Sequence, residues 1–304
     1  MKNRIKFATT ALFASALAVL AGNDAHSDAG TNVAGTQAIY GNIPADQAEF
    51  ISTPDRIKAV VASGSMTAIY ETLEHGERVD CLDCIPAVQP LLYSSNPRTR
   101  EIAAWWLRRR VFGVFGPNEP YQQNLTKLAS DPDPNIRAYA ADAVGEFLSS
   151  AGTESLATAA TKDTDGMVRA SALNALSRMN DDGAGTVGRA MSDGDPRVKL
   201  AALSAAGRVH GFADGAKVTP LVADQDPIVR RRAAEVLGTL HVKTAVPQLR
   251  TAAKSDADPQ VRAAACHTLG RLGDATAKPD LSAIASADAD GFVRDMAQMA
   301  LLRL

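Results

Sequence analysis

The motif in this 304-residue chain that could carry chemistry is Cys81-Leu-Asp-Cys84. Two cysteines this close can form a local disulfide, which persists in an oxidising compartment. They could instead act as a redox pair, because a thiolate is stabilised just before a helix start, where Cys84 lies. With His75 they offer three metal donors, but structural zinc sites use four and no fourth is evident. The disulfide, the redox pair and the metal site all remain possible on sequence alone.

Two further interpretations of this motif are disfavoured by its surroundings. A thioredoxin-type pair needs a βαβ setting, and no strand pattern is present here. Attachment of a c-type haem needs a histidine directly after the second cysteine, where this chain has Ile85.

The other reactive residues do not form a catalytic set. Cys266 lies in an Ala-rich helical segment and is expected to be a buried, small apolar residue. No two histidines stand at a helical spacing that would bind a metal, and nothing marks a nucleophile for a Ser–His–acid arrangement. We therefore predict no catalytic residue and no cofactor. The histidines are His26, His75, His210, His241 and His267.

A short phrase, Asp-Pro/Gly-x-apolar-Arg/Lys, recurs through most of the chain. Its basic residues are separated by 32, 30, 31, 32 and 32 positions, and a variant copy, Asn96 to Arg100, precedes the first. A period this regular indicates a solenoid of stacked repeats. The six copies begin at Asp133, Asp165, Asp195, Asp226, Asp258 and Asp290 and end at Arg137, Arg169, Lys199, Arg230, Arg262 and Arg294.

The phrase predicts the start of a helix. Aspartate accepts bonds from the first free backbone N–H groups, and proline fits the first helical position. Ala-rich segments such as 262–270 follow, and a second, shorter helix such as 246–254 precedes the next copy. Glycines shortly after each Ala-rich segment are expected to end the first helix. They are Gly145, Gly207, Gly238, Gly270 and Gly273.

This pattern resembles the HEAT repeat proteins, specifically the bacterial PBS-lyase HEAT-like repeat, over about residues 85–304. The resemblance implies an all-α, right-handed α-solenoid of about seven or eight two-helix repeats. It also implies that the Asp and Arg or Lys residues of the six copies form a structural ladder between adjacent repeats. A catalytic role is disfavoured for them, because a catalytic residue would not recur in every repeat.

The residues do not support the activity of two enzymatic relatives of this family. Deoxyhypusine hydroxylases hold a di-iron centre with repeated His-Glu pairs, but no histidine of this chain is followed directly by glutamate. Phycobilin lyases gave the repeat its name, yet no residue here can be carried over as a chromophore ligand.

The N-terminus has the pattern of an export signal. Three basic residues precede an apolar stretch that ends in Val-Leu-Ala21, a plausible cleavage site before Gly22. Cleavage would change the formal charge from −2 to −5 by removing Lys2, Arg4 and Lys6. Lipidation is not predicted, because Asn23 stands where a lipoprotein would carry its lipidated cysteine. The chain is thus predicted to be exported to the periplasm or outside the cell, with no stable membrane anchor after cleavage, and its charge gives no indication of nucleic-acid binding.

The predicted organisation has four segments. Residues 1–21 form the signal peptide, 22–45 a flexible leader and 46–95 an atypical capping repeat that carries the two cysteines. HEAT-like repeats fill 96–304. Six of the fifteen aromatic residues lie in 93–121, at the join between the cap and the regular repeats. They could pack this join or form a partner surface.

We expect an exported, non-enzymatic scaffold that binds a protein partner through a surface formed by the second helices. The alternatives are an oxidoreductase or metal-binding protein using Cys81 and Cys84, or a HEAT-like lyase or hydroxylase relative acting on a tetrapyrrole or a protein. If the chain is an enzyme, an oxidoreductase is expected. The candidates for the partner surface are Trp105, Trp106, Tyr121, Gln122, Arg189, Lys217 and Arg250.

Overall fold

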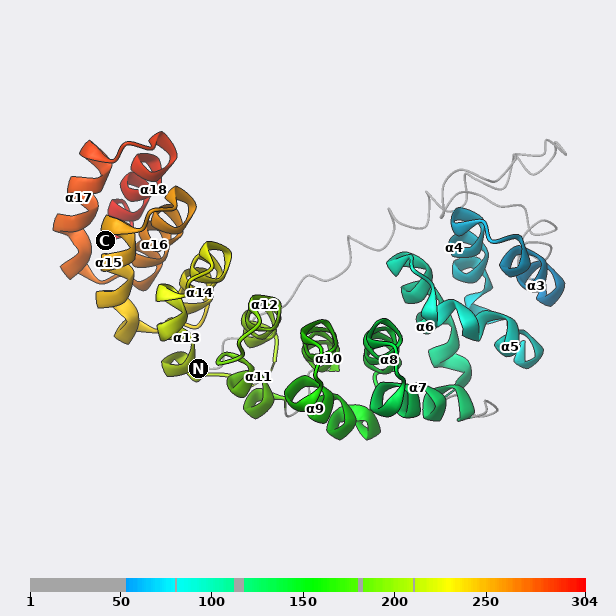
Figure 1. Ribbon diagram of the computed structural model, residues 1–304. Coiled ribbons are helices and arrows are strands. Elements are labelled where there is room, and N and C mark those ends of the chain that lie inside the picture. Colours follow the sequence, from blue (N-terminus) through cyan, green and yellow to red (C-terminus); the bar gives the residue numbers. More distant parts are fainter. Residues whose placement is uncertain (1–52, 80, 112–117, 180–182, 210) are drawn as a thin grey trace, which may run out of the picture. The chain divides into compact units, whose positions relative to one another are not determined.

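The computed structural model describes residues 53–79, 81–111, 118–179, 183–209 and 211–304. In these residues the protein has 16 α-helices and no strand (Figure 1). No helix among them has the length and apolar character needed to span a membrane. The predicted signal peptide and leader, and the aromatic residues Phe112 and Phe115, lie outside the described residues.

Each repeated phrase begins a helix, as predicted. The aspartate accepts hydrogen bonds from backbone N–H groups of the first turn, for example from Gln260 to Asp258 at 2.7 Å. We call these the Asp-Pro helices, and include α6, which starts at the variant copy. They are α6 (Pro97–Val111), α8 (Pro134–Phe147), α10 (Gly166–Met179), α12 (Pro196–Ala206), α14 (Pro227–Thr239), α16 (Pro259–Leu272) and α18 (Gly291–Leu301).

A shorter second helix precedes each Asp-Pro helix. Two of these second helices continue as a 3-10 helix, because a proline interrupts the α-helical hydrogen bonds. They are α5 (Ile85–Val88) with η3 (Gln89–Tyr93), α7 (Glu119–Ser130), α9 (Thr153–Lys162), α11 (Ala184–Ala190), α13 (Gly215–Val218) with η5 (Thr219–Ala223), α15 (Val246–Ser255) and α17 (Lys278–Ala287).

The second and Asp-Pro helices form seven pairs in contact, and α3 (Pro54–Ser63) with α4 (Met66–His75) adds one more at the N-terminal end. The expected seven or eight two-helix repeats are thus confirmed. Successive Asp-Pro helices pack directly on each other, as α8 does on α10 and α16 on α18. Successive second helices form another layer with fewer mutual contacts. A continuous Ala, Val and Leu core lies between the layers.

The prediction that glycine ends each Asp-Pro helix is wrong for three of the five glycines. Gly207 and Gly273 do follow the last helical residue, but Gly145, Gly238 and Gly270 lie inside their helices. Their role is close packing instead. A Cβ on Gly145 would lie 2.6 Å from the Cβ of Ala175 in the next repeat, a distance that real side chains do not reach.

The N-terminal pair consists of two separate helices. Gly64 adopts a left-handed conformation with φ 68° and separates α3 from α4. The pair buries Ile57, Ile69 and Leu73 against the following helices. Helix α4 ends at His75, directly before Gly76.

Candidate partner-binding surface

Cys81 and Cys84 are joined in a disulfide, with an S–S distance of 2.10 Å. The bond lies between η1 (Gly76–Arg78) and α5, on the 3-10 helix η2 (Leu82–Cys84). Cys81 is 5% exposed and Cys84 is fully buried. In this state neither sulfur is a thiolate, so neither is a nucleophile or a ready metal ligand. The arrangement favours a structural bridge over the redox and metal interpretations.

His75, the third weak metal candidate, lies at the end of α4. Its Nδ1 is 2.6 Å from the carbonyl oxygen of Glu71 in its own helix. No group of three or more His, Cys, Asp or Glu side chains in the described part of the chain is arranged to hold a metal ion. Cys266 is fully buried, and burial raises the pKa of its thiol to about 12. Its prediction as a buried apolar residue is confirmed.

The segment before the disulfide is held by Arg110, the last of three consecutive arginines on α6. Arg110 is only 3% exposed. Its guanidinium donates hydrogen bonds to the carbonyl oxygens of Gly76 and Glu77 at 2.9 Å and to that of Val79, and it lies 3.4 Å from the centre of the Trp106 ring. Trp106 itself donates from Nε1 to the carbonyl oxygen of Gly76 at 3.0 Å. Arg110 and Trp106 are therefore structural.

The ladder between repeats exists, but its acidic members are not the predicted ones. Arg262 Nη2 donates to Asp288 of the next repeat at 2.8 Å, and Nε donates to the same carboxylate at 2.9 Å. Asp258 and Asp290, like their equivalents, cap their own helices instead. The same pairing occurs four more times, in Arg137–Asp163, Arg169–Asp193, Lys199–Asp224 and Arg230–Asp256.

The correction has a simple physical reason. The capping carboxylate is committed to N–H groups of its own helix, whereas the aspartate two residues earlier follows the preceding second helix and faces the neighbouring repeat. Asp256 shows the arrangement: its carboxylate accepts from Arg230, and its carbonyl oxygen accepts from Arg262 at 2.9 Å. The sequence did carry the signal, because every copy of the phrase is preceded by Asp-x, as in Asp256-Ala-Asp258.

The candidates for the partner surface differ in how exposed their side chains are. Trp106 is fully buried and Tyr121 is 1% exposed, so their assignment to a partner surface is wrong: both pack the join of cap and repeats. Trp105 is half-buried on α6. Arg250 is half-buried and forms an ion pair with Asp280 of the next repeat. The exposed candidates are Gln122, Arg189 and Lys217, all on second helices.

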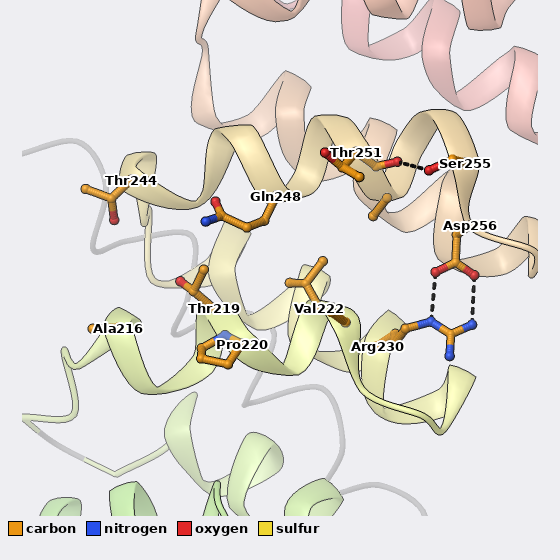
Figure 2. Close-up of a pocket in the computed structure, with 12 residues that line it drawn as sticks. Ala216, Thr219, Pro220, Val222, Arg230, Thr244, Gln248, Thr251, Ser255 and Asp256 are labelled. Atoms are coloured by element: carbon orange, nitrogen blue, oxygen red, sulfur yellow. Dashed lines mark hydrogen bonds and ion pairs between the residues drawn. The ribbon is translucent and has the colours of Figure 1, made fainter.

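A groove of about 650 Å³ lies on the surface of the second helices, between α13 with η5 and α15 (Figure 2). Small apolar side chains, among them Ala216, Pro220 and Val222, form one part of its lining. The hydroxyls of Thr219 and Thr251 and the amide of Gln248 supply polar groups beside them. The groove ends at the ladder pair Arg230–Asp256, which fixes one repeat against the next.

The groove can bind by shape and hydrogen bonding. Thr219 and Thr251 donate their hydroxyl protons to their own helices, so their oxygens remain available as acceptors. Gln248 is exposed and has no hydrogen-bond partner among the described residues, so its amide can both donate and accept. A second groove, of about 400 Å³, occupies the equivalent place between α7 and α9 and ends at Asp163. Glu154 and Lys162 make that groove charged.

A family model described as HEAT repeats matches residues 122–187 and 215–302. The chain belongs to the HEAT repeat family. No curated protein matches this HEAT repeat chain.

Solved structures share its fold. YibA of E. coli is 16% identical, with a TM-score of 0.56, and the match covers 85% of this chain and 95% of YibA. A chain from the complex of Kap95p with RanGDP is 14% identical, with a TM-score of 0.60, and the match covers 84% of this chain but 41% of that one. The CpcE–CpcF complex of phycocyanin lyase from Nostoc is 21% identical over 72% of this chain and 86% of that chain, with a TM-score of 0.39.

Proposed function

We propose that this HEAT repeat protein is an exported, non-enzymatic scaffold that binds a protein partner through the surface of its second helices. The observation that carries the proposal is the groove between η5 and α15. Its apolar lining would contact a partner's side chain, and the surrounding hydroxyl and amide groups would bond the partner's backbone. An apolar centre with a polar edge is the usual anatomy of a protein interface.

The regular frame supports this role. Ladder pairs and close-packed Asp-Pro helices fix the spacing of the second helices, so the groove is formed before a partner arrives. Binding then orders few groups, which reduces its entropic cost. Exposed residues that differ from one repeat to the next, such as Gln122, Arg189 and Lys217, would provide specificity on this constant frame.

Export is proposed from the sequence alone, on the basic and apolar pattern of residues 1–21. The disulfide between Cys81 and Cys84 is consistent with an oxidising compartment. Intact mass of the protein recovered from the periplasm tests both features. A chain that starts at Gly22 and is 2 Da lighter than its reduced form is expected, whereas an uncleaved chain with free thiols would contradict them.

Photo-crosslinking tests the partner surface. A photoreactive residue at Gln248 should crosslink to a discrete protein in cells, whereas one at Gln225, exposed on the loop beyond η5, should not. Thr251→Arg fills the groove with a side chain that favours helix, so it should abolish the crosslink and leave the thermal midpoint unchanged. Equal crosslinking with and without Thr251→Arg would contradict the proposed site.

A further inference from the structure

One position at the C-terminal end of the Asp-Pro helices is exposed or half-buried in every repeat, nine residues after the basic residue of the phrase; in the repeats of α12 and α18 it lies just beyond the last helical residue. In α8 and α10 it holds Glu146 and Arg178, which form an ion pair of 3.1 Å between adjacent repeats. The close approach of Gly145 to Ala175 brings these two helices together beside the pair. The residues at this position are Arg109, Glu146, Arg178, Arg208, Thr239, Arg271 and Arg303.

The last two Asp-Pro helices, α16 and α18, have arginine at this position, whereas α8 and α10 have opposite charges there. Gly270 and Ala300 bring α16 and α18 together as closely as Gly145 and Ala175 bring α8 and α10, with a Cβ on Gly270 only 2.7 Å from Ala300 Cα. Arg271 directly follows Gly270, and Arg303 lies three residues after Ala300. Both arginines are exposed. Neither has an ion pair or a hydrogen bond from its side chain within the described parts of the chain.

Both of these positive charges act on His267. It lies one turn before Arg271, at the position that Asp142 occupies in α8. Burial lowers its pKa first, and the charges of Arg303 and Arg271 lower it further. The nearby carboxylate, Glu235, is engaged by Arg232 at 2.9 Å. Two positive charges beside the same side chain repel each other, and an external anion would relieve that repulsion.

We propose that Arg271 and Arg303 form a docking site for an acidic segment of a partner protein. The reason for a carboxylate is structural: the equivalent junction already seats one, Glu146, against Arg178. Arginine binds carboxylates through paired N–H groups, and a ligand carboxylate would bridge the two guanidiniums as Glu146 engages one. The site is at the C-terminal ends of α16 and α18 and therefore independent of the groove on the second helices.

Binding of a fluorescein-labelled deca-glutamate peptide to the full chain, followed by fluorescence anisotropy at low salt, tests the site. The double variant Arg271→Gln/Arg303→Gln should bind at least about tenfold more weakly, because it loses two charged hydrogen-bonding groups. Arg178→Gln is the matched control: its guanidinium is already paired with Glu146, so it should bind within about twofold of the wild type. Thr251→Arg, which blocks the groove, should also leave this binding unchanged.

Arg303→Glu separates binding from folding. It would give Arg271 the kind of partner that Arg178 has in Glu146, so it should abolish peptide binding while raising the thermal midpoint by about 1–3 °C. Three results would overturn the proposal: no peptide binding by the wild type, equal loss in Arg178→Gln, or binding of inorganic phosphate or anionic phosphatidylglycerol vesicles in preference to the peptide.

Discussion

The joint between α4 and α6 and the joints between the regular repeats are both stabilised by an arginine, but the arginine is bonded differently in each. In both, an arginine donates hydrogen bonds to backbone carbonyl oxygens next to a helix end. At the regular joints Arg230 and its equivalents bond one carboxylate of the next repeat and carbonyls of their own. At the N-terminal joint Arg110 is nearly fully buried, bonds the carbonyls of Gly76, Glu77 and Val79, and packs on Trp106.

The difference teaches which joint tolerates change. A regular joint tolerates a different basic residue. In one of them Lys199 takes the place of the arginine and still bonds Asp224 at 2.6 Å. The N-terminal joint depends on the planar fork of one buried guanidinium that donates to four carbonyls, those of Gly76, Glu77, Val79 and Trp106, a geometry that lysine cannot reproduce.

The largest effect is expected from Arg110→Ala. It should lower the free energy of unfolding by about 3–5 kcal/mol, because it removes the buried charged donor that bonds the carbonyls of Gly76, Glu77 and Val79 and leaves a void beside Trp106. Chemical denaturation measures this, with Arg109→Ala as the control, since Arg109 is exposed on the same helix. Similar stabilities for the two variants would contradict the role of Arg110.

Gly145→Ala probes the close packing of the regular layer. Its Cβ would meet Ala175 at 2.6 Å, so α8 and α10 must separate, and the expected cost is about 2–3 kcal/mol. Gly207→Ala is the matched control, because Gly207 is at the same position of its repeat and a Cβ there would meet nothing closer than 4.0 Å. The control should change stability by less than about 0.5 kcal/mol. A neutral Gly145→Ala would show that the helices do not need this approach.

Arg230→Ala breaks one ladder pair. It should cost about 1–3 kcal/mol, because the Asp256 side chain, only 8% exposed, loses its charged partner. Arg230→Lys should cost less than about 1 kcal/mol if the joint tolerates lysine as the Lys199 joint does. If Arg230→Lys lost as much stability as Arg230→Ala, the regular joint would not tolerate lysine, and the distinction between the two kinds of joint would be contradicted.

Replacing both Cys81 and Cys84 with serine removes the cross-link beside the N-terminal joint. The bond closes a very short loop, so its loss should cost about 1–2 kcal/mol. Thermal unfolding of this variant and of the wild type with reductant should agree. A much larger loss would indicate that the disulfide, rather than Arg110, organises this joint.

Protonation of a ladder carboxylate at low pH is expected to have the smallest effect on the unfolding free energy at any single joint. The hydrogen bond from Arg262 is the main cause that lowers the pKa of Asp288 below its ordinary value of 3.8. In Asp256 burial raises the pKa, but the bonds from Arg230 and the backbone of Asp258 outweigh it, and the net shift is also downward. These carboxylates therefore contribute stability that is present above pH 3.8 and lost as the pH falls through the lowered values. Unfolding free energies measured across this range should depend less on pH in Asp288→Asn, and an unchanged slope would contradict the prediction.

The repeat frame was readable from the sequence because it rests on local rules. Asp258 caps a helix through its own side chain, and an apolar residue three positions later begins the buried stripe, so the pattern predicted the helices, their order and their number. The ladder partners could also have been found, because Asp256 and its equivalents recur two residues before each cap.

Other features depend on neighbours that are distant in the chain. Gly145 has the sequence signature of a helix end, yet it lies within α8 because Ala175 of the next repeat approaches it. Trp106 and Tyr121 resemble partner anchors by residue type and are buried by tertiary packing. Arg110 stands in a run of three arginines, and only the path of residues 76–79 distinguishes it from Arg109.

The sequence by itself thus determined the helical repeat, its period and its capping, since these follow from backbone hydrogen bonding and side-chain spacing within one repeat. The tertiary structure alone decided which carboxylate each ladder arginine bonds, which arginine is buried, and where the second helices leave a groove. Those outcomes depend on how far apart neighbouring repeats lie, and that distance is set by packing between residues about 30 positions apart.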